Sequence, residues 1–126
     1  MRATRPSALS PGGSVIRLGS IAADQGADAY GAAKAGLASW NVSLARQLGA
    51  RGIACNVVSP GYTLGTEFFR DRMTPERHET LVARTATGRA GAVEDVVGAV
   101  WFLASPAARH ITAQVLNVNG GAWPTR

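Results

Sequence analysis

Residues 29–61 read AYGAAKAGLASWNVSLARQLGARGIACNVVSPG, and this stretch indicates the fold class. Residues 29–48 lack proline, are rich in alanine and repeat large apolar side chains at spacings of three and four, which predicts an amphipathic helix. Residues 53–59 are a short, mainly apolar run stopped by a proline–glycine pair, which predicts a buried strand. A long helix followed by a buried strand is typical of parallel α/β proteins.

The flanking segments continue this alternation. Residues 14–18 predict a buried strand and residues 114–118 another, each followed by a glycine-containing turn. Residues 93–103 predict a helix with acidic residues in its first turn, where negative charge suits the helix dipole. The remaining predictions are a loose tail at 1–13, a loop at 24–28, and helices at 67–73 and 75–85.

The predicted order is strand, helix, strand, helices, strand, which is an α/β fold with parallel strands and right-handed crossovers. Parallel sheets are normally buried on both faces, and the helices here are too few to cover both faces. The two edges of so small a sheet also stay open. We therefore interpret residues 1–13 as a flexible tail and residues 14–126 as a partial domain that belongs to a larger sheet.

Composition excludes several classes of protein. With 126 residues, 46% apolar and 17% charged, the chain suits one domain and is not intrinsically disordered. Cys55 is the only cysteine, so neither an internal disulfide nor a cysteine-cluster zinc site is expected. The apolar run at 96–104 is shorter than the ~20 residues of a membrane span, and no signal peptide is visible. We expect a cytoplasmic protein with no membrane partner and no metal.

The net charge of +5 comes from twelve arginines and one lysine against eight acidic residues. The arginines are scattered, form no long run and do not alternate with aromatic residues. The densest group, within 70–89, is interspersed with acidic residues, so an ordinary solvated surface is favoured over a phosphate-binding face. No nucleic-acid partner is expected. His78 and His110 have no ligand spacing around them and are interpreted as surface or packing histidines.

Tyr30 and Lys34 stand four residues apart near the start of the predicted long helix. Side chains at this spacing share one helical face, so the phenol and the ammonium can approach the same space. A nearby cation lowers the pKa of a phenol and makes it a useful general acid or base. The residues between them have little or no side chain, which leaves room for a ligand against the backbone. A chance pair on a surface helix is the alternative.

Two further groups follow predicted strands, at the edge where parallel α/β sheets bind ligands. Ser20 either hydrogen-bonds a substrate oxygen or satisfies the backbone of a turn. Pro60 and Gly61 either let a ligand approach the backbone closely or form a plain turn. Thr63 and Thr66 follow within the same loop.

Several ordered motifs together resemble the short-chain dehydrogenase/reductase family, particularly its 3-oxoacyl-carrier-protein reductase-like members. The resemblance covers residues 13–121, nearly the whole chain. The motifs are GSIA at 19–22, YGAAKAGL at 30–37, NVVSPG at 56–61, GRAG at 88–91, FLAS at 102–105, IT at 111–112 and NVNGG at 117–121.

The resemblance implies an NAD(P)-dependent oxidoreductase that transfers hydride between a nicotinamide cofactor and a carbonyl or secondary alcohol substrate. Tyr30 would be the general acid or base. Lys34 would assist it and hydrogen-bond the nicotinamide ribose, and Ser20 would hold the substrate oxygen. The residues between Ser20 and Tyr30 are fewer than the family usually has.

The resemblance also implies a cofactor side, formed by Pro60, Gly61, Thr63 and Thr66, and a mobile substrate-binding loop at 64–87. One extra residue separates the proline–glycine pair from Thr66. The choice between NAD and NADP stays open.

The glycine-rich nucleotide-binding turn of the family has no counterpart in this sequence. The resemblance therefore implies the carboxyl-terminal half of a doubly wound, Rossmann-like sheet. The rival hypothesis is a truncated, inactive fragment that acts through association with a partner subunit. A homo-oligomer is expected through the 29–48 helix and the carboxyl-terminal strand. The apolar helix positions proposed for association are Leu37, Trp40, Leu44 and Leu48.

Overall fold

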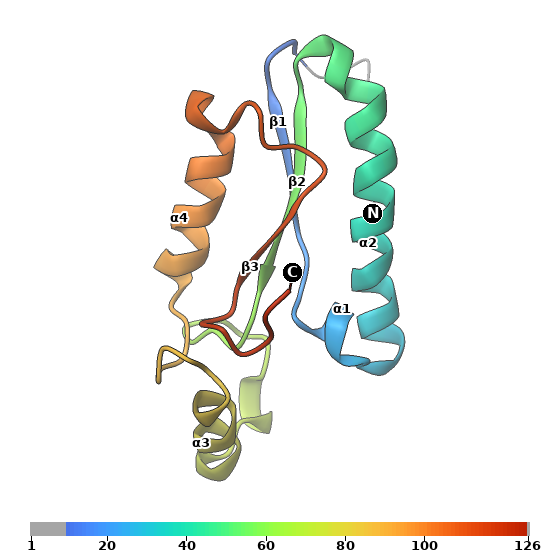
Figure 1. Ribbon diagram of the computed structural model, residues 1–126. Coiled ribbons are helices and arrows are strands. Elements are labelled where there is room, and N and C mark those ends of the chain that lie inside the picture. The colour runs from blue at the N-terminus through green and yellow to red at the C-terminus, as the bar shows by residue number, and fades with distance from the viewer. Residues whose placement is uncertain (1–9, 126) are drawn as a thin grey trace.

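The computed structural model describes residues 10–125, and in them a parallel sheet of three strands in the order β1-β2-β3. The strands are β1 (Ser14–Leu18), β2 (Ala54–Pro60) and β3 (Val115–Val118) (Figure 1). The predicted α/β class and all three strands are confirmed to within one residue. Most of the predicted tail, residues 1–9, lies outside the described residues.

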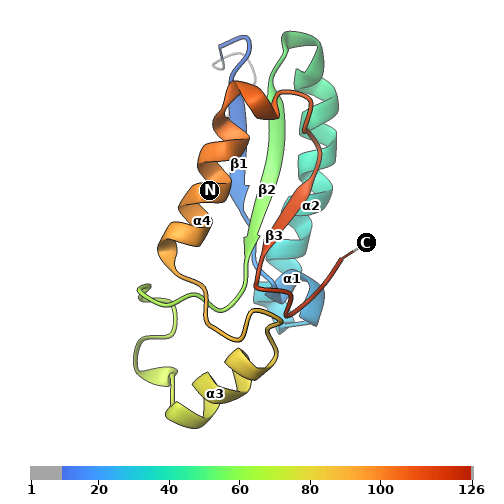
Figure 2. The same ribbon diagram turned by 60° about the vertical axis from the view of Figure 1, so that its left-hand side comes forward.

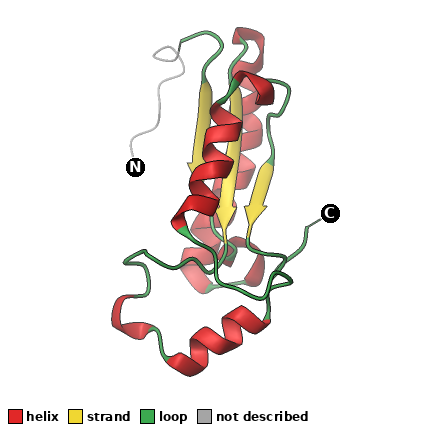
Figure 3. Cartoon of the chain, turned by 90° about the vertical axis from the view of Figure 1, so that its left-hand side faces the viewer, coloured by secondary structure: helices red, strands yellow, loops and turns green. Residues whose placement is uncertain are grey.

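One long helix covers each face of the sheet. α2 (Asp28–Leu48) lies on one face and α4 (Val93–Ala104) on the other, as Figures 1 and 2 show. α1 (Ala22–Gln25) and α3 (Pro75–Ala83) lie near the carboxyl ends of the strands (Figure 3). Three-residue 3₁₀ turns occupy Gly49–Arg51, Arg70–Arg72 and Pro106–Ala108.

Two sequence predictions about local structure were wrong. The loop expected at 24–28 begins inside α1, which ends at Gly26 in a left-handed conformation that glycine adopts without strain. The helix expected at 67–73 is reduced to the 3₁₀ turn Arg70–Arg72. By contrast, α3 begins with Pro75 in the first turn, and the Thr74 hydroxyl caps it by accepting a hydrogen bond from the Arg77 amide at 3.1 Å.

β2 is the central strand, and its first six residues are all buried. Because side chains alternate along a strand, the two faces hold separate cores. Cys55 packs with Leu44, Ala45, Leu48 and Ile53 on the α2 face. On the α4 face, Val58 packs with Leu103 and Ala108.

β1 is an edge strand in the described part of the chain, because only β2 pairs with it. It was expected to be buried, but both of its end residues are exposed and the rest are half-buried. Leu18 is 53% exposed. The unpaired edge and the exposed leucine agree with the interpretation of a partial sheet.

The apolar stripe of α2 is divided between the core and the partly exposed surface. Leu44 and Leu48 are 4% and 1% exposed because they pack against the sheet, and Leu37 and Trp40 are half-buried. The core therefore already uses Leu44 and Leu48, whereas association through the rest of the 29–48 helix stays a prediction.

Candidate functional site

The loops that follow β1 and β2 are bonded together at the carboxyl end of the sheet. The Gly19 amide donates to the Val58 carbonyl at 2.7 Å, and the Ile21 amide donates to the Pro60 carbonyl at 2.9 Å. Ser20 is therefore held beside the end of β2. This is the edge at which open parallel sheets bind ligands, and α1 and α3 lie next to it (Figure 3).

Tyr30 and Lys34 lie on the same side of α2, as their spacing predicts. The Lys34 ammonium is 5.9 Å from the centre of the Tyr30 ring and donates to the Leu18 carbonyl at 2.9 Å. That bond ties the helix to the last residue of β1 and fixes the cation beside the phenol. Tyr30 is 42% exposed, so its ring is open to solvent or to a ligand.

The space beside Gly31 is filled, contrary to the prediction that it leaves room for a ligand. A methyl group at Gly31 would lie 2.7 Å from the Ala22 carbonyl oxygen. Glycine is therefore required here because α1 packs directly on the first turn of α2. Ala32 and Ala33 remain exposed.

Ser20 makes the backbone contact that was one of its two predicted roles. Its hydroxyl oxygen accepts a hydrogen bond from the Ala22 amide at 3.1 Å. A hydroxyl has one donor hydrogen and two lone pairs, so the hydrogen of Ser20 is still available.

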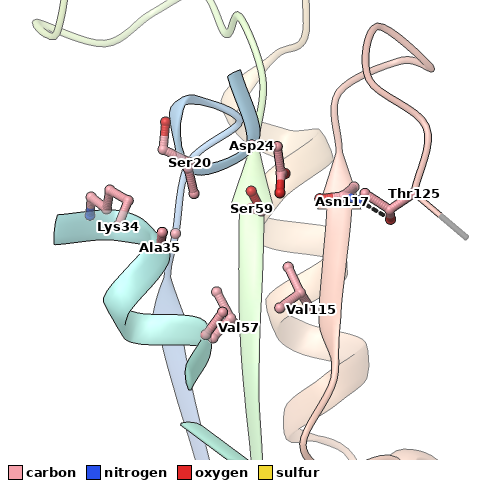
Figure 4. A pocket seen from close by; sticks show the side chains of 12 residues that line it. Ser20, Asp24, Lys34, Ala35, Val57, Ser59, Val115, Asn117 and Thr125 are labelled. Atoms are coloured by element: carbon pink, nitrogen blue, oxygen red, sulfur yellow. Dashed lines mark hydrogen bonds between the residues drawn. The ribbon is translucent and has the colours of Figure 1, made fainter. Parts of the chain in front are cut away.

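A first cavity of about 280 Å³ opens on the α2 face of the sheet. Ser20 and Lys34 line it, with Ser59 on β2 and Asn117 on β3 (Figure 4). The Asn117 amide nitrogen donates to the Thr125 hydroxyl at 2.6 Å. Its carbonyl oxygen, Oδ1, is buried without a hydrogen-bond partner in the described residues. Sequence reasoning did not single out Ser59 or Asn117 as functional.

A second cavity of about 470 Å³ lies on the opposite, α4 face. Three residues of the predicted cofactor side line it, namely Pro60, Thr63 and Thr66. The remaining walls are Leu18 and apolar residues of α4. The structure therefore divides the predicted site residues between two cavities on either side of the sheet, and Tyr30 lines neither of them.

Gly61 makes a close contact within the protein. A methyl group at this position would lie 2.6 Å from Cβ of Asn119, so glycine allows the turn after β2 to pack on the loop after β3. The Gly61 amide donates to the Val118 carbonyl at 3.0 Å. The Thr63 hydroxyl donates to the Gly61 carbonyl at 3.0 Å, which leaves its lone pairs free.

The segment after Gly61 contains aromatic contacts that the sequence did not reveal. The Phe68 ring lies 5.5 Å from the Tyr30 ring, centre to centre. The Tyr62 hydroxyl lies 2.6 Å from Nδ1 of His78, which makes His78 a packing residue of α3. The contact between Phe68 and Tyr30 joins two segments far apart in the sequence, and no local pattern predicts such a pairing.

Three arginines of the 70–89 group bond to other residues of the chain. Arg89 pairs with both carboxylate oxygens of Asp95 at 2.8 and 3.1 Å. Arg72 and Arg77 donate to the carbonyls of Phe68 and Arg72, respectively. Burial raises the pKa of the Cys55 thiol, and the positive charge of nearby Arg17 offsets only part of that increase.

Residues 10–125 contain no group of three or more histidine, cysteine, aspartate or glutamate side chains placed to hold a metal. No helix in that range is long and apolar enough to cross a membrane.

The fold and the position of the site define a protein class, the doubly wound α/β proteins that bind ligands at the carboxyl ends of parallel strands. A sequence model of the family described as enoyl-(acyl carrier protein) reductase matches residues 1–122. The chain belongs to the short-chain dehydrogenase/reductase family.

Individual relatives agree with this membership. The 3-oxoacyl-[acyl-carrier-protein] reductase FabG of Escherichia coli (strain K12) is 39% identical over 114 residues, which cover 88% of this chain and 46% of the relative. L-rhamnose 1-dehydrogenase (NAD(P)(+)) of Sphingomonas sp. (strain SKA58) is 42% identical over 116 residues, 89% of this chain and 45% of the relative. The chain thus spans about half the length of these curated relatives.

Solved structures show the same partial overlap. A short-chain dehydrogenase/reductase (glucose/ribitol dehydrogenase) from Brucella melitensis matches with a TM-score of 0.86 and 31% identity, over 94% of this chain and 49% of its own. A blue fluorescent protein from a metagenomic library, solved in complex with NADPH, matches with a TM-score of 0.81 and 36% identity, over 94% of this chain and 48% of its own.

Proposed function

We propose that this chain supplies the proton-transfer side of an NAD(P)-dependent oxidoreductase that interconverts a carbonyl compound and a secondary alcohol. The observation that carries the proposal is the Tyr30–Lys34 pair, with the ammonium bonded to the Leu18 carbonyl at the carboxyl end of the sheet. The names of the relatives support it, since they include a 3-oxoacyl reductase and an NAD(P)-dependent sugar dehydrogenase.

In the reduction, the Tyr30 hydroxyl donates its proton to the carbonyl oxygen of the substrate. A nicotinamide cofactor, when bound, would supply the hydride for the new C–H bond. In the oxidation, the phenolate oxygen accepts the proton of the alcohol. Lys34 places a positive charge 5.9 Å from the centre of the Tyr30 ring, and the free hydroxyl hydrogen of Ser20 can bond to the substrate oxygen.

The second cavity fits the nicotinamide end of such a cofactor in chemical character. Its mainly apolar walls suit the face of an aromatic ring, and the hydroxyls of Thr63 and Thr66 suit a carboxamide or a phosphate. The described residues contain no glycine-rich turn between a strand and a following helix that would hold the diphosphate. We therefore expect the chain by itself to bind NADH or NADPH weakly.

The test joins this chain to the part of the E. coli relative that the match leaves uncovered. Consumption of NADH and NADPH is then measured with a panel of ketones and 3-oxoacyl thioesters. A general acid contributes about 10²–10⁴-fold to a rate, so Tyr30→Phe is expected to reduce turnover by that order. Lys34→Ala is expected to cause a comparable loss.

Two controls accompany these variants. Ser39→Ala changes an exposed residue of α2 and should leave turnover unchanged. Lys34→Arg keeps the charge but changes its geometry, so only partial activity is expected. Turnover that survives both Tyr30→Phe and Lys34→Ala, or no turnover in the unmodified fusion with any substrate, would contradict the proposal.

A further inference from the structure

A row of aromatic rings runs from α3 to Tyr30. The Tyr30 and Phe68 rings are 5.5 Å apart, the Phe68 and Phe69 rings 4.9 Å, and the Phe69 and Tyr62 rings 5.5 Å, centre to centre. Tyr62 in turn lies 5.5 Å from the ring of His78. These separations lie within the range of favourable aromatic pairing, so the five rings form one continuous contact.

The α3 end of this row is fixed by polar contacts. The Tyr62 hydroxyl and Nδ1 of His78 share a hydrogen bond of 2.6 Å. The Arg77 guanidinium lies 5.1 Å from the centre of the Phe69 ring, a cation–π distance. Arg72 donates to the carbonyl oxygen of Phe68 at 2.9 Å, so the backbone of Phe68 is also held.

Both ends of the segment that carries the row are bonded to the rest of the protein. At its start, the Leu64 amide donates to the Gly91 carbonyl at 2.8 Å, and the Gly91 amide donates to the Tyr62 carbonyl at 2.9 Å. At its end, the Ala86 amide donates to the Gly120 carbonyl at 2.7 Å, beside β3. The segment is therefore closed at its base and tied to the loop after β3, and its Phe68 contacts Tyr30 in the first turn of α2.

Phe68 is the aromatic neighbour of Tyr30 in the described part of the chain. Tyr30 is 42% exposed, and its ring contacts the Phe68 ring and lies near the Lys34 ammonium. A phenol that must meet a substrate oxygen within hydrogen-bond distance has to be held in one orientation. Lys34 itself is fixed by Leu18, but a single cation at 5.9 Å does not fix the rotation of a ring.

We propose that Phe68 is a positioning residue, which holds the Tyr30 ring in place and draws its own position from the aromatic row that ends at His78. The functional meaning of this inference rests on the proton-transfer role proposed for Tyr30, whereas the mechanical contact does not. The segment between Gly61 and Gly91 then controls the orientation of the phenol as well as the space around it.

The test uses the whole chain labelled with 3-fluorotyrosine, because a sequence with two tyrosines gives two fluorine NMR signals. Tyr30→Phe identifies the signals by removing one of them. In Phe68→Ala the Tyr30 signal is expected to move toward its position in the denatured chain, and in Phe68→Leu to move less. Phe68 is 51% exposed, so both variants should remain folded, which far-UV circular dichroism checks.

Phe102→Ala is the matched control, since Phe102 has a similar exposure of 45% but lies on α4. It should leave the Tyr30 signal in place. Tyr62→Phe removes only the hydroxyl bonded to His78, and we expect it to shift the Tyr30 signal in the same direction as Phe68→Ala, by a smaller amount. A Tyr30 signal that stays unchanged in folded Phe68→Ala would overturn the inference.

The kinetic readout uses the fusion described above. Phe68→Ala is expected to lower kcat by about tenfold or more, with an unchanged KM for the nicotinamide cofactor, because misplacing a reacting group affects the chemical step. The two proposals fail separately. A shifted signal with full activity in Tyr30→Phe refutes the catalytic role only, whereas an unshifted signal with inactive Tyr30→Phe refutes the positioning role only.

Discussion

The two helices that cover the sheet are held to it by different kinds of interaction. On the α2 face, fully buried Asn41 accepts a hydrogen bond from Arg17 at 3.3 Å and donates to the Cys55 carbonyl at 3.0 Å. On the α4 face, buried Asn56 bonds to the loop before β3, donating to the Ile111 carbonyl at 2.8 Å and accepting from the Gln114 amide at 3.1 Å. α4 itself packs on the sheet through apolar side chains, with one bond from the Ser14 hydroxyl to the Leu103 carbonyl at 3.4 Å. Outward from this core, Val97 and Trp101 are 56% and 79% exposed.

The difference matters because the α2 face carries the candidate catalytic pair. Hydrogen bonds are directional, so those of Asn41 and Lys34 permit one position of α2 along the sheet. Apolar contacts are not directional and tolerate small displacements. Precise placement is therefore concentrated where Tyr30 needs it, while the α4 face presents an apolar surface.

The largest effect is expected from opening a cavity in each core. Leu48 and Leu103 are 1% and 2% exposed, and truncating such a leucine to alanine costs about 2–5 kcal/mol. Leu48→Ala should lie at the upper end, because its neighbours Leu44 and Ile53 are themselves buried and cannot collapse easily. Leu103→Ala should cost less, because its partly exposed surroundings can relax.

Urea denaturation measures both free energies of unfolding. Ser43→Ala, at an exposed position of α2, is the control and should stay within ~0.5 kcal/mol of the unmodified chain. Equal losses at Leu48 and Leu103, or a larger loss at Leu103, would show that the two cores are equally rigid.

The second effect concerns the buried polar group of the α2 face. Asn41→Ala removes this donor from the Cys55 carbonyl, which keeps its bond from the Ala113 amide, so the expected cost is about 0.5–1.5 kcal/mol. It should also broaden the Tyr30 fluorine signal, because the helix loses a directional bond to the sheet. A loss in stability with an unchanged Tyr30 signal would mean that Lys34 alone fixes the helix.

The sequence predicted the elements whose pattern is local. The bounds of β2 and of the alanine-rich α2 were predicted to within one residue. Both predictions rest on patterns among neighbouring residues, a run of apolar residues for the strand and a periodic apolar spacing for the helix. α1 was missed, because its four residues are too few for a periodic pattern. The 3₁₀ turn at Arg70–Arg72 was predicted as a helix, since the residues around it favour a helix that the tertiary contacts do not allow.

The candidate site was predictable to a smaller extent. The proximity of Tyr30 and Lys34 follows from helical geometry, and in the structure the Lys34 ammonium lies 5.9 Å from the centre of the Tyr30 ring. Ser20 and Thr63 line cavities on opposite faces of the sheet, and this was not predicted. The sequence indicates that both residues follow the carboxyl end of a strand, but not on which face of the sheet each of them lies. Phe68 was not singled out, since its contact with Tyr30 spans segments far apart in the chain.

A smaller effect is expected from the apolar surface of the α4 face. Trp101→Ser removes the most exposed of the large apolar side chains there, and the free energy of unfolding should change by no more than ~0.5 kcal/mol. Binding of a dye that reports exposed apolar surface should decrease, because contiguous apolar area binds such dyes. Val42→Ser, at an exposed position of α2, should leave dye binding unchanged. If Val42→Ser lowered dye binding more than Trp101→Ser, the exposed apolar surface would lie on the α2 face instead.

The smallest effect concerns how the start of α4 is held. The Asp95 carboxylate accepts hydrogen bonds from the Arg89 side chain and from the Ala92 amide at 2.8 Å, and these bonds lower its pKa to about 2. Because the folded pKa is depressed, the stabilisation is complete above the ordinary carboxyl pKa and is lost as the pH falls toward 2.

Carbon-13 NMR titration of the Asp95 carboxyl measures this pKa directly. Arg89→Ala should raise it toward the ordinary value but not reach it, because the bond from the Ala92 amide remains. Arg84→Ala, which removes an exposed arginine outside this pair, should leave the titration unchanged. The pair with Arg89 is solvated, so salt should weaken it, whereas the buried bonds of Asn41 should not respond to salt. If the pKa of Asp95 did not change with salt concentration, the first turn of α4 would be held as rigidly as α2 is held on the sheet.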